Sequence, residues 1–133
     1  MSARPATRIF VVDDEPVIAS TLAAILRING FSARFFTSAL EALTAARSKA
    51  PDLLISDVTM PGISGIDFAI QMRAQHHECK ILLFTGQPHS LDLLEDARAQ
   101  GHDFPLLLKP IPPSEFLLEI GKMVNGNVEI HAV

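Results

Sequence analysis

Acidic, hydroxyl and basic side chains follow four of the five short apolar runs in the sequence. Asp13 and Asp14 come after the first run, Asp57 after the third, Thr85 after the fourth and Lys109 after the fifth. Crowded carboxylates repel one another, and a hard divalent cation with oxygen ligands, such as Mg²⁺, would relieve that repulsion. A carboxylate can attack phosphorus to give an aspartyl phosphate, whose oxygens a lysine and a hydroxyl can bind. The residue types therefore predict a phosphoryl-acceptor site.

Such a site requires a fold that brings the ends of these runs together. The runs are continuous rather than alternating, as expected of strands buried on both faces of a parallel sheet. They are Ile9–Val12, Ala33–Phe36, Leu53–Ile55, Ile81–Phe84 and Leu106–Leu108. Pro105 lacks an amide proton, so we expect the fifth strand at the edge of the sheet.

Amphipathic segments with helical periodicity separate the runs. One carries Ile18 to Leu26 before an Asn29-Gly30 stop, one begins at Ser38 in a capping box with Glu41, and the others are Ile66 to Gln75, Ser90 to Gln100, and a helix beginning at Pro113. Five strands alternating with five helices predict a doubly wound α/β fold. Ligands of such folds bind beyond the carboxyl ends of the strands, which is where the polar residues lie.

Four motifs occur in order along the chain. They are Val11-Val12-Asp13-Asp14-Glu15, Asp57-Val58-Thr59-Met60-Pro61-Gly62, Leu83-Phe84-Thr85-Gly86 and Leu108-Lys109-Pro110. In spacing and order the chain resembles the receiver domains of bacterial two-component response regulators. The resemblance covers residues 8–124 and leaves tails at 1–7 and 125–133. It implies a flavodoxin-like sheet of five parallel strands in the order 2-1-3-4-5, with five helices.

The resemblance also implies roles for individual residues. Asp57 would be the phosphoacceptor, and Asp14 would bind Mg²⁺ directly while Asp13 acts largely through a water molecule. The main-chain carbonyl of Thr59 would be a further ligand, so the implied metal site is Asp13, Asp14, Asp57 and Thr59.

Two further residues complete the site that the resemblance implies. Thr85 would bind a phosphoryl oxygen, and Lys109 would pair with the phosphate and an acid. The fifth run departs from the family pattern, because Leu106 stands where Tyr or Phe is usual and Phe104-Pro105 occupies an interval one residue longer than usual. Leucine has no ring to turn inward behind the threonine. We therefore expect a weaker or differently placed response on the face of the fourth helix, fifth strand and fifth helix.

Composition limits the class of protein. The chain has 133 residues, one domain's worth, and a net charge of −4, which argues against nucleic-acid binding. No apolar run approaches the roughly 20 residues that cross a bilayer. Cys79 is the single cysteine, so an internal disulfide is impossible, as suits a reducing compartment. We expect a cytoplasmic domain that contacts neither nucleic acid nor membrane.

The leading hypothesis is a phosphoacceptor signalling module that takes a phosphoryl group on Asp57 from a sensor histidine kinase or a phosphotransfer protein. It would catalyse only its own phosphorylation and dephosphorylation, and so would not be an enzyme. About nine residues follow the fifth helix, so we expect no attached output domain. Output would pass through a protein partner, a homodimer or onward phosphotransfer.

Two other functions remain as alternatives. A Mg²⁺-dependent phosphatase resembling haloacid dehalogenases needs an Asp-x-Asp pair after the first strand, whereas Asp13 and Asp14 are adjacent. A phosphorylation-independent adaptor would be signalled by loss of an acid or the lysine, and neither is lost.

Three features have simpler explanations than a functional site. His76-His77-Glu78-Cys79 lacks the separated ligand pairs of structural zinc sites, and we interpret it as a solvated helix end. His89 and His102 are expected at the surface. Leu91, Leu93 and Leu94 are expected in the core, with part of their helix open to a partner.

Overall fold

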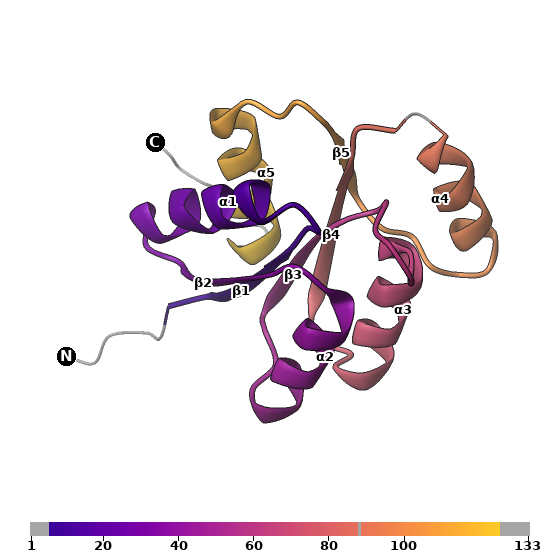
Figure 1. Cartoon of the computed structure of the whole chain (residues 1–133), viewed down its shortest axis with the longest axis horizontal. Helices are drawn as coiled ribbons and strands as arrows, with labels where there is room; N and C mark the ends of the chain where they lie inside the picture. The colour runs from indigo at the N-terminus through magenta and orange to yellow at the C-terminus, as the bar shows by residue number, and fades with distance from the viewer. Residues whose placement is uncertain (1–5, 88, 126–133) are drawn as a thin grey trace.

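The computed structural model describes residues 6–87 and 89–125, in which strands and helices alternate strictly along the chain (Figure 1). The strands are β1 (Arg8–Val12), β2 (Ser32–Phe36), β3 (Leu53–Asp57), β4 (Lys80–Thr85) and β5 (Leu106–Leu108). The helices are α1 (Pro16–Ile28), α2 (Ala39–Ser48), α3 (Gly65–Gln75), α4 (Ser90–Ala99) and α5 (Pro113–Asn125). The predicted elements are all present, with ends that differ by a few residues at most.

All five strands are parallel and lie in the order β2-β1-β3-β4-β5. The predicted doubly wound, flavodoxin-like sheet is confirmed, and so is the edge position of the fifth strand. The carbonyl of Pro105 still accepts a hydrogen bond from the Leu83 amide at 2.9 Å. Proline is tolerated there because it lies just before an edge strand, where it needs no amide proton.

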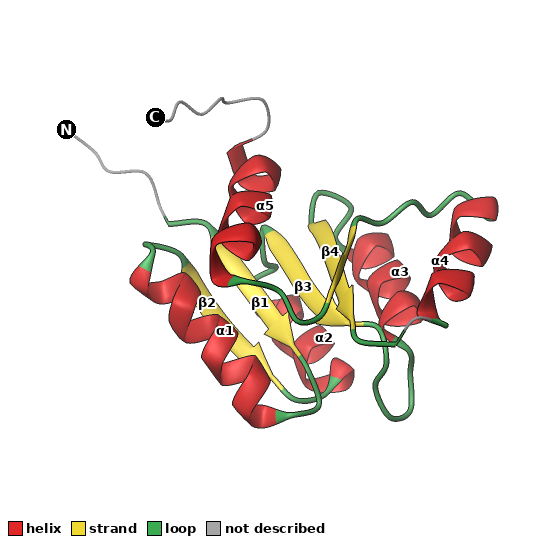
Figure 2. Ribbon diagram, turned by 90° about the horizontal axis from the view of Figure 1, so that it is seen from above, coloured by secondary structure: helices red, strands yellow, loops and turns green. Residues whose placement is uncertain are grey.

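Two helical layers cover the sheet, with α1 and α5 on one face and α2, α3 and α4 on the other (Figure 2). Alternate side chains of β1 enter opposite cores: Ile9 and Val11 pack with α1 and α5, whereas Phe10 and Val12 pack with α2 and α3. This double burial explains why the strand sequences are continuously apolar.

Local signals place the helix ends. The Ser38 hydroxyl accepts a hydrogen bond from the Glu41 amide at 3.1 Å and so caps α2 as predicted. Ser64 caps α3 in the same way through the Asp67 amide, which the sequence analysis missed. Gly30 follows α1 with a φ of +93°, a conformation that other residues rarely adopt.

The expectation for the leucines of α4 is partly wrong. Leu94 is buried, but Leu91 and Leu93 are 46% and 44% exposed. The buried positions of α4 are Ser90, Leu94 and Ala97, whose spacing defines one helical face. Leu91 and Leu93 flank that face, so apolar character alone did not indicate which leucines point inward.

The histidine- and cysteine-containing segment after α3 shows no metal site. Within residues 6–87 and 89–125, the one group of His, Cys, Asp and Glu side chains close enough to share an ion is that of Asp13, Asp14 and Asp57. His77 and Glu78 are exposed, as predicted for a solvated helix end. Cys79 departs from that prediction because it is buried, and burial raises the pKa of its thiol to about 12. Burial therefore disfavours the thiolate, the form in which cysteine binds metal.

Two other features follow from the described residues. His89 is exposed, whereas His102 is half-buried and stacks on Phe104 with ring centroids 6.2 Å apart, so only His89 fits the surface prediction.

No helix in the described ranges is both long and apolar enough to span a membrane. The predicted boundary at residue 8 coincides with the start of β1, whereas α5 continues one residue past 124. The predicted tails otherwise lie mostly outside the described residues.

Candidate phosphoryl-acceptor site

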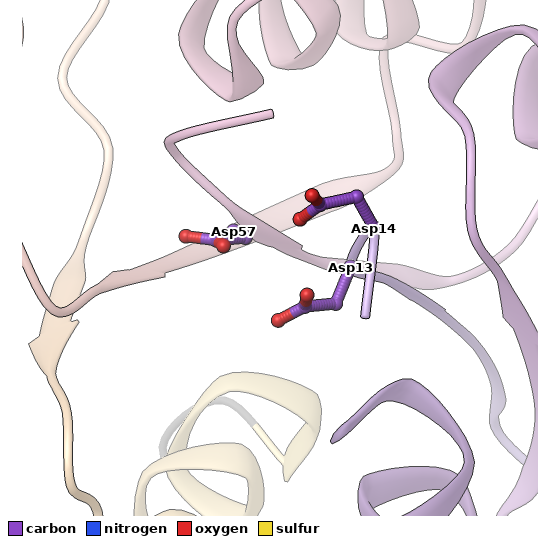
Figure 3. A group of neighbouring side chains, drawn as sticks. All are labelled: Asp13, Asp14 and Asp57. Atoms are coloured by element: carbon purple, nitrogen blue, oxygen red, sulfur yellow. The ribbon is translucent and has the colours of Figure 1, made fainter. Parts of the chain in front are cut away.

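Three carboxylates converge at the carboxyl edge of the sheet. Asp13 and Asp14 follow β1, Asp57 is the last residue of β3, and Figure 3 shows their side chains gathered together. One carboxylate oxygen from each lies within 4.8 Å of the others. The register explains this, because β1 and β3 are neighbours in which Val12 pairs with Ser56. The predicted acidic cluster is therefore present.

Lys109 lies between two of these acids. Its Nζ is 3.3 Å from Asp13 Oδ2 and 3.4 Å from Asp57 Oδ2. The ammonium also lies over the ring of Phe84, 4.8 Å from its centroid. The Lys109 amide donates a 2.8 Å hydrogen bond to the Thr85 carbonyl, which fixes the end of β5 against β4. A positive charge is thus positioned beside the predicted phosphoacceptor.

The electrostatics of the cluster are dominated by burial. Asp57 is 7% exposed, and its desolvation raises the pKa of its carboxyl above the ordinary aspartate value. Lys109 opposes that shift, the charge of Asp13 adds to it, and the Thr59 amide, which donates to Asp57 Oδ1 at 3.3 Å, lowers the pKa again. The net effect is a carboxylate whose charge needs a cation nearby.

The acids after β1 differ in their surroundings. Asp13 is fully buried, and its Oδ1 accepts a 2.9 Å hydrogen bond from the Glu15 amide at the start of α1. Asp14 is exposed, so a metal ion can replace water beside its carboxylate at little cost in free energy. Three acidic oxygens, one of them open to solvent, fit a hard divalent cation that keeps several waters. The structure ties Thr59 to Asp57, while its carbonyl remains a predicted ligand.

Close backbone packing holds the acceptor strand. The Gly65 amide, the first of α3, donates a 2.7 Å hydrogen bond to the Val58 carbonyl. A Cβ on Gly65 would overlap the carbonyl oxygen of Asp57 and lie 2.8 Å from the Val58 Cα. This role of Gly65 was not predicted from the sequence, and its signal is a glycine at the first position of a helix shortly after the acceptor.

Thr85, the last residue of β4, is fully buried at the same edge. Its hydroxyl accepts a 3.0 Å hydrogen bond from the Gln87 amide and pairs with the hydroxyl of Ser90 at 3.1 Å. The structure therefore brings all the predicted site residues to one edge of the sheet, and it adds Gly65 and Ser90 as their supports.

Comparison with known sequences gives a consistent result. Residues 9–120 match the response regulator receiver domain family. The chain is 32% identical over 120 residues to the DNA-binding response regulator MtrA of Mycolicibacterium smegmatis, a match that covers 90% of this chain and 51% of MtrA. It is 34% identical over 117 residues to the transcriptional regulatory protein CreB of Escherichia coli, covering 88% and 50% of the two chains. The chain thus spans about half the length of the curated relatives it matches.

Solved structures give the same picture. A receiver domain of an HD domain-containing protein from Pseudomonas fluorescens superposes with a TM-score of 0.84 at 26% identity, covering 94% of this chain and 91% of that one. The response regulator TrrA of Thermotoga maritima, solved in complex with Mg²⁺-BeF, superposes with a TM-score of 0.76 at 32% identity, covering 88% and 98%. Sequence, topology and the acidic edge of the sheet agree, and the chain belongs to the response regulator receiver domain family.

Proposed function

We propose that the chain accepts a phosphoryl group on Asp57 from a sensor histidine kinase or a phosphotransfer protein and signals through protein contacts. One observation carries the proposal: the buried carboxylate of Asp57 lies beside two further acids and beside the ammonium of Lys109. A carboxylate between a potential cation site and a lysine is placed to receive a group that carries several negative charges.

The chemistry follows from these groups. A carboxylate oxygen of Asp57 forms a bond to phosphorus as the bond between phosphorus and the donor imidazole nitrogen breaks, and that nitrogen keeps the electron pair. Lys109 binds an oxygen of the arriving phosphoryl group and offsets its charge, and Thr85 is the nearby hydroxyl that can bind another. Asp13, Asp14, Asp57 and the carbonyl of Thr59 would hold Mg²⁺, which would supply positive charge to offset that of the transferred group.

We also propose that the chain is not an enzyme toward other substrates. In support, Asp13 and Asp14 are adjacent, whereas phosphatases resembling haloacid dehalogenases use an Asp-x-Asp pair. The catalysis proposed here is limited to phosphorylation and dephosphorylation of Asp57.

The proposed setting is cytoplasmic, with a protein as the output partner or a homodimer as the alternative. The single cysteine and the family of the chain support that location. A net charge of −4 favours a domain that does not itself bind nucleic acid. MtrA is named a DNA-binding response regulator, but the match to this chain covers 51% of MtrA. The name therefore describes a protein about half of which has no counterpart in the match.

The test is mass spectrometry of the intact chain after incubation with acetyl phosphate and Mg²⁺. We expect a gain of one phosphoryl group, which Asp57→Asn and, separately, EDTA should abolish because each removes an essential part of the site. Asp96→Asn is the matched control, since Asp96 is an exposed carboxylate of α4, and it should be labelled like the unmodified chain. Full labelling of Asp57→Asn would contradict the assignment.

A further inference from the structure

Thr85 and Ser90 form a buried pair of hydroxyls between the acceptor site and α4. Thr85 ends β4 and Ser90 begins α4, and both side chains are 0% exposed. Their oxygens are 3.1 Å apart, and either can be the donor. A hydrogen bond between two fully buried hydroxyls is costly to leave unmade, because neither group can turn to water instead.

The hydrogen bonds of the Thr85 hydroxyl run toward α4. Its Oγ1 accepts from the Gln87 amide at 3.0 Å and pairs with Ser90, whereas the described residues include no hydrogen bond from this hydroxyl to Asp57 or Lys109. A hydroxyl has one proton to donate. When Thr85 donates that proton to Ser90, it is not available to a phosphoryl oxygen.

We propose that Ser90 is a positioning residue that holds the Thr85 hydroxyl toward α4 and competes for it with a phosphoryl group on Asp57. This inference rests on the function proposed above. It identifies Ser90 as the residue that opposes the turn of Thr85 toward the phosphoryl group and that passes this change to α4. When Thr85 turns to the phosphoryl group, Ser90 loses its buried partner. The first turn of α4 then moves until the Ser90 hydroxyl finds water or a new partner.

The packing of α4 would carry that movement outward. Ser90 shares the buried face of the helix with Leu94 and Ala97, and His89 at the N-cap makes no side-chain capping bond that would hold the helix end. The exposed Leu91 and Leu93 flank this face. A shift at Ser90 therefore changes how these two leucines are presented to a partner.

The first test is titration with beryllofluoride and Mg²⁺, a mimic of the phosphorylated state, followed by NMR of the labelled chain. Ser90→Ala should bind beryllofluoride about three- to tenfold more tightly, the effect of removing one competing neutral hydrogen bond. Thr44→Ala is the matched control, because it removes a helical hydroxyl in α2 that bonds only the Leu40 carbonyl, at 2.9 Å. Its affinity should not change.

A double-mutant cycle separates competition from a general effect on folding. In a Thr85→Ala background, Ser90→Ala should leave beryllofluoride affinity unchanged, since the hydroxyl that Ser90 restrains is gone. In the unmodified background it should also change the Thr85 χ1 populations, measured by three-bond couplings, before any beryllofluoride is added. A merely structural role would alter affinity equally in both backgrounds and leave the Thr85 rotamer as it was.

The outcomes that overturn the proposal are distinct from those that overturn the proposed function. Unchanged or weaker binding by Ser90→Ala overturns the competition, and weaker binding would instead mean that Ser90 orients Thr85 toward the phosphoryl group. Binding that survives Asp57→Asn, or no binding by the unmodified chain, overturns the acceptor assignment and the Ser90 proposal with it.

Discussion

The strands β3 and β5 each position one charged residue of the acceptor site, Asp57 at the end of β3 and Lys109 directly after β5, but they are supported very differently. β3 has a strand on either side and all five of its residues are buried. β5 has three residues, pairs only with β4, and has no fully buried residue. The main chain at Asp57 is therefore held by a neighbouring strand on each side. Lys109 follows a strand that is paired on one side and less buried, so the reacting group lies at the end of a central buried strand and the counter-charge lies beside an edge strand.

Removal of a leucine from each strand should give the largest difference in stability. Leu54→Ala, in the centre of β3, should lower the free energy of unfolding by about 3 kcal/mol because it leaves a cavity in a closed core. Leu106→Ala, in half-buried β5, should cost about 1 kcal/mol because water can enter and less area is lost. Urea unfolding followed by circular dichroism measures both, and equal losses would contradict the contrast.

A methyl group on Gly65 should disturb the acceptor end of β3. Gly65→Ala should cost about 1–3 kcal/mol of unfolding free energy through overlap with the main chain of Asp57 and Val58. It should also slow labelling by acetyl phosphate about tenfold, as expected when a reacting group is misplaced. The matched control is Gly121→Ala, since a Cβ there meets nothing within 4 Å and alanine favours the helix. Normal labelling of Gly65→Ala would show that β3 tolerates the methyl group.

Because Asp57 is buried at the end of β3, its ionised carboxylate should lower the stability of the folded state when metal is absent. Because the pKa of Asp57 is raised, the folded state binds its proton more tightly than the unfolded chain does. Its stabilising contribution is therefore complete below the ordinary aspartate pKa and is lost as the pH rises through the raised pKa. In EDTA, Asp57→Asn should melt at a higher temperature than the unmodified chain near neutral pH, and the gap should narrow toward about pH 4.

Calorimetry or circular dichroism can follow this melting, since the chain has no Trp or Tyr for fluorescence. Asp14→Asn provides the comparison, because the carboxylate of Asp14 is exposed and should contribute a smaller gap. If the difference in melting temperature between Asp57→Asn and the unmodified chain widened on acidification, the raised pKa of Asp57 would be contradicted.

The smallest expected effect is the change in the NMR signals of β5 when beryllofluoride occupies the acceptor site. Beryllofluoride should shift the amide signals of the loops after β1, β3 and β4 and of the first turn of α4. The signals of β5 and α5 should move less, since Leu106 has no ring to turn inward. Leu106→Tyr should enlarge the β5 shifts. Shifts in the unmodified chain that spread through Leu106 to α5, as large as in receivers with an aromatic residue there, would contradict this expectation.

The residues of the site could be predicted from the sequence for a physical reason. In a parallel sheet, the residue after each strand falls at a common edge whatever the details of packing, so reading the polar residues that follow apolar runs was enough to gather Asp13, Asp57, Thr85 and Lys109. The same reasoning could not orient a helix. Leu91, Leu93 and Leu94 are alike as residue types, and only the position of α4 against the sheet shows that Leu94 faces inward.

The sequence by itself determined the alternation of strands and helices, the edge position of the last strand and the acidic cluster, because these depend on local patterns and on the geometry common to parallel sheets. Tertiary structure alone decided that the Asp57 charge is buried, that Lys109 reaches both Asp13 and Asp57, and that Ser90 holds the hydroxyl of Thr85. These properties depend on distances of a few ångströms between segments far apart in the chain or across a loop. The spacing of residues along the sequence does not determine such distances.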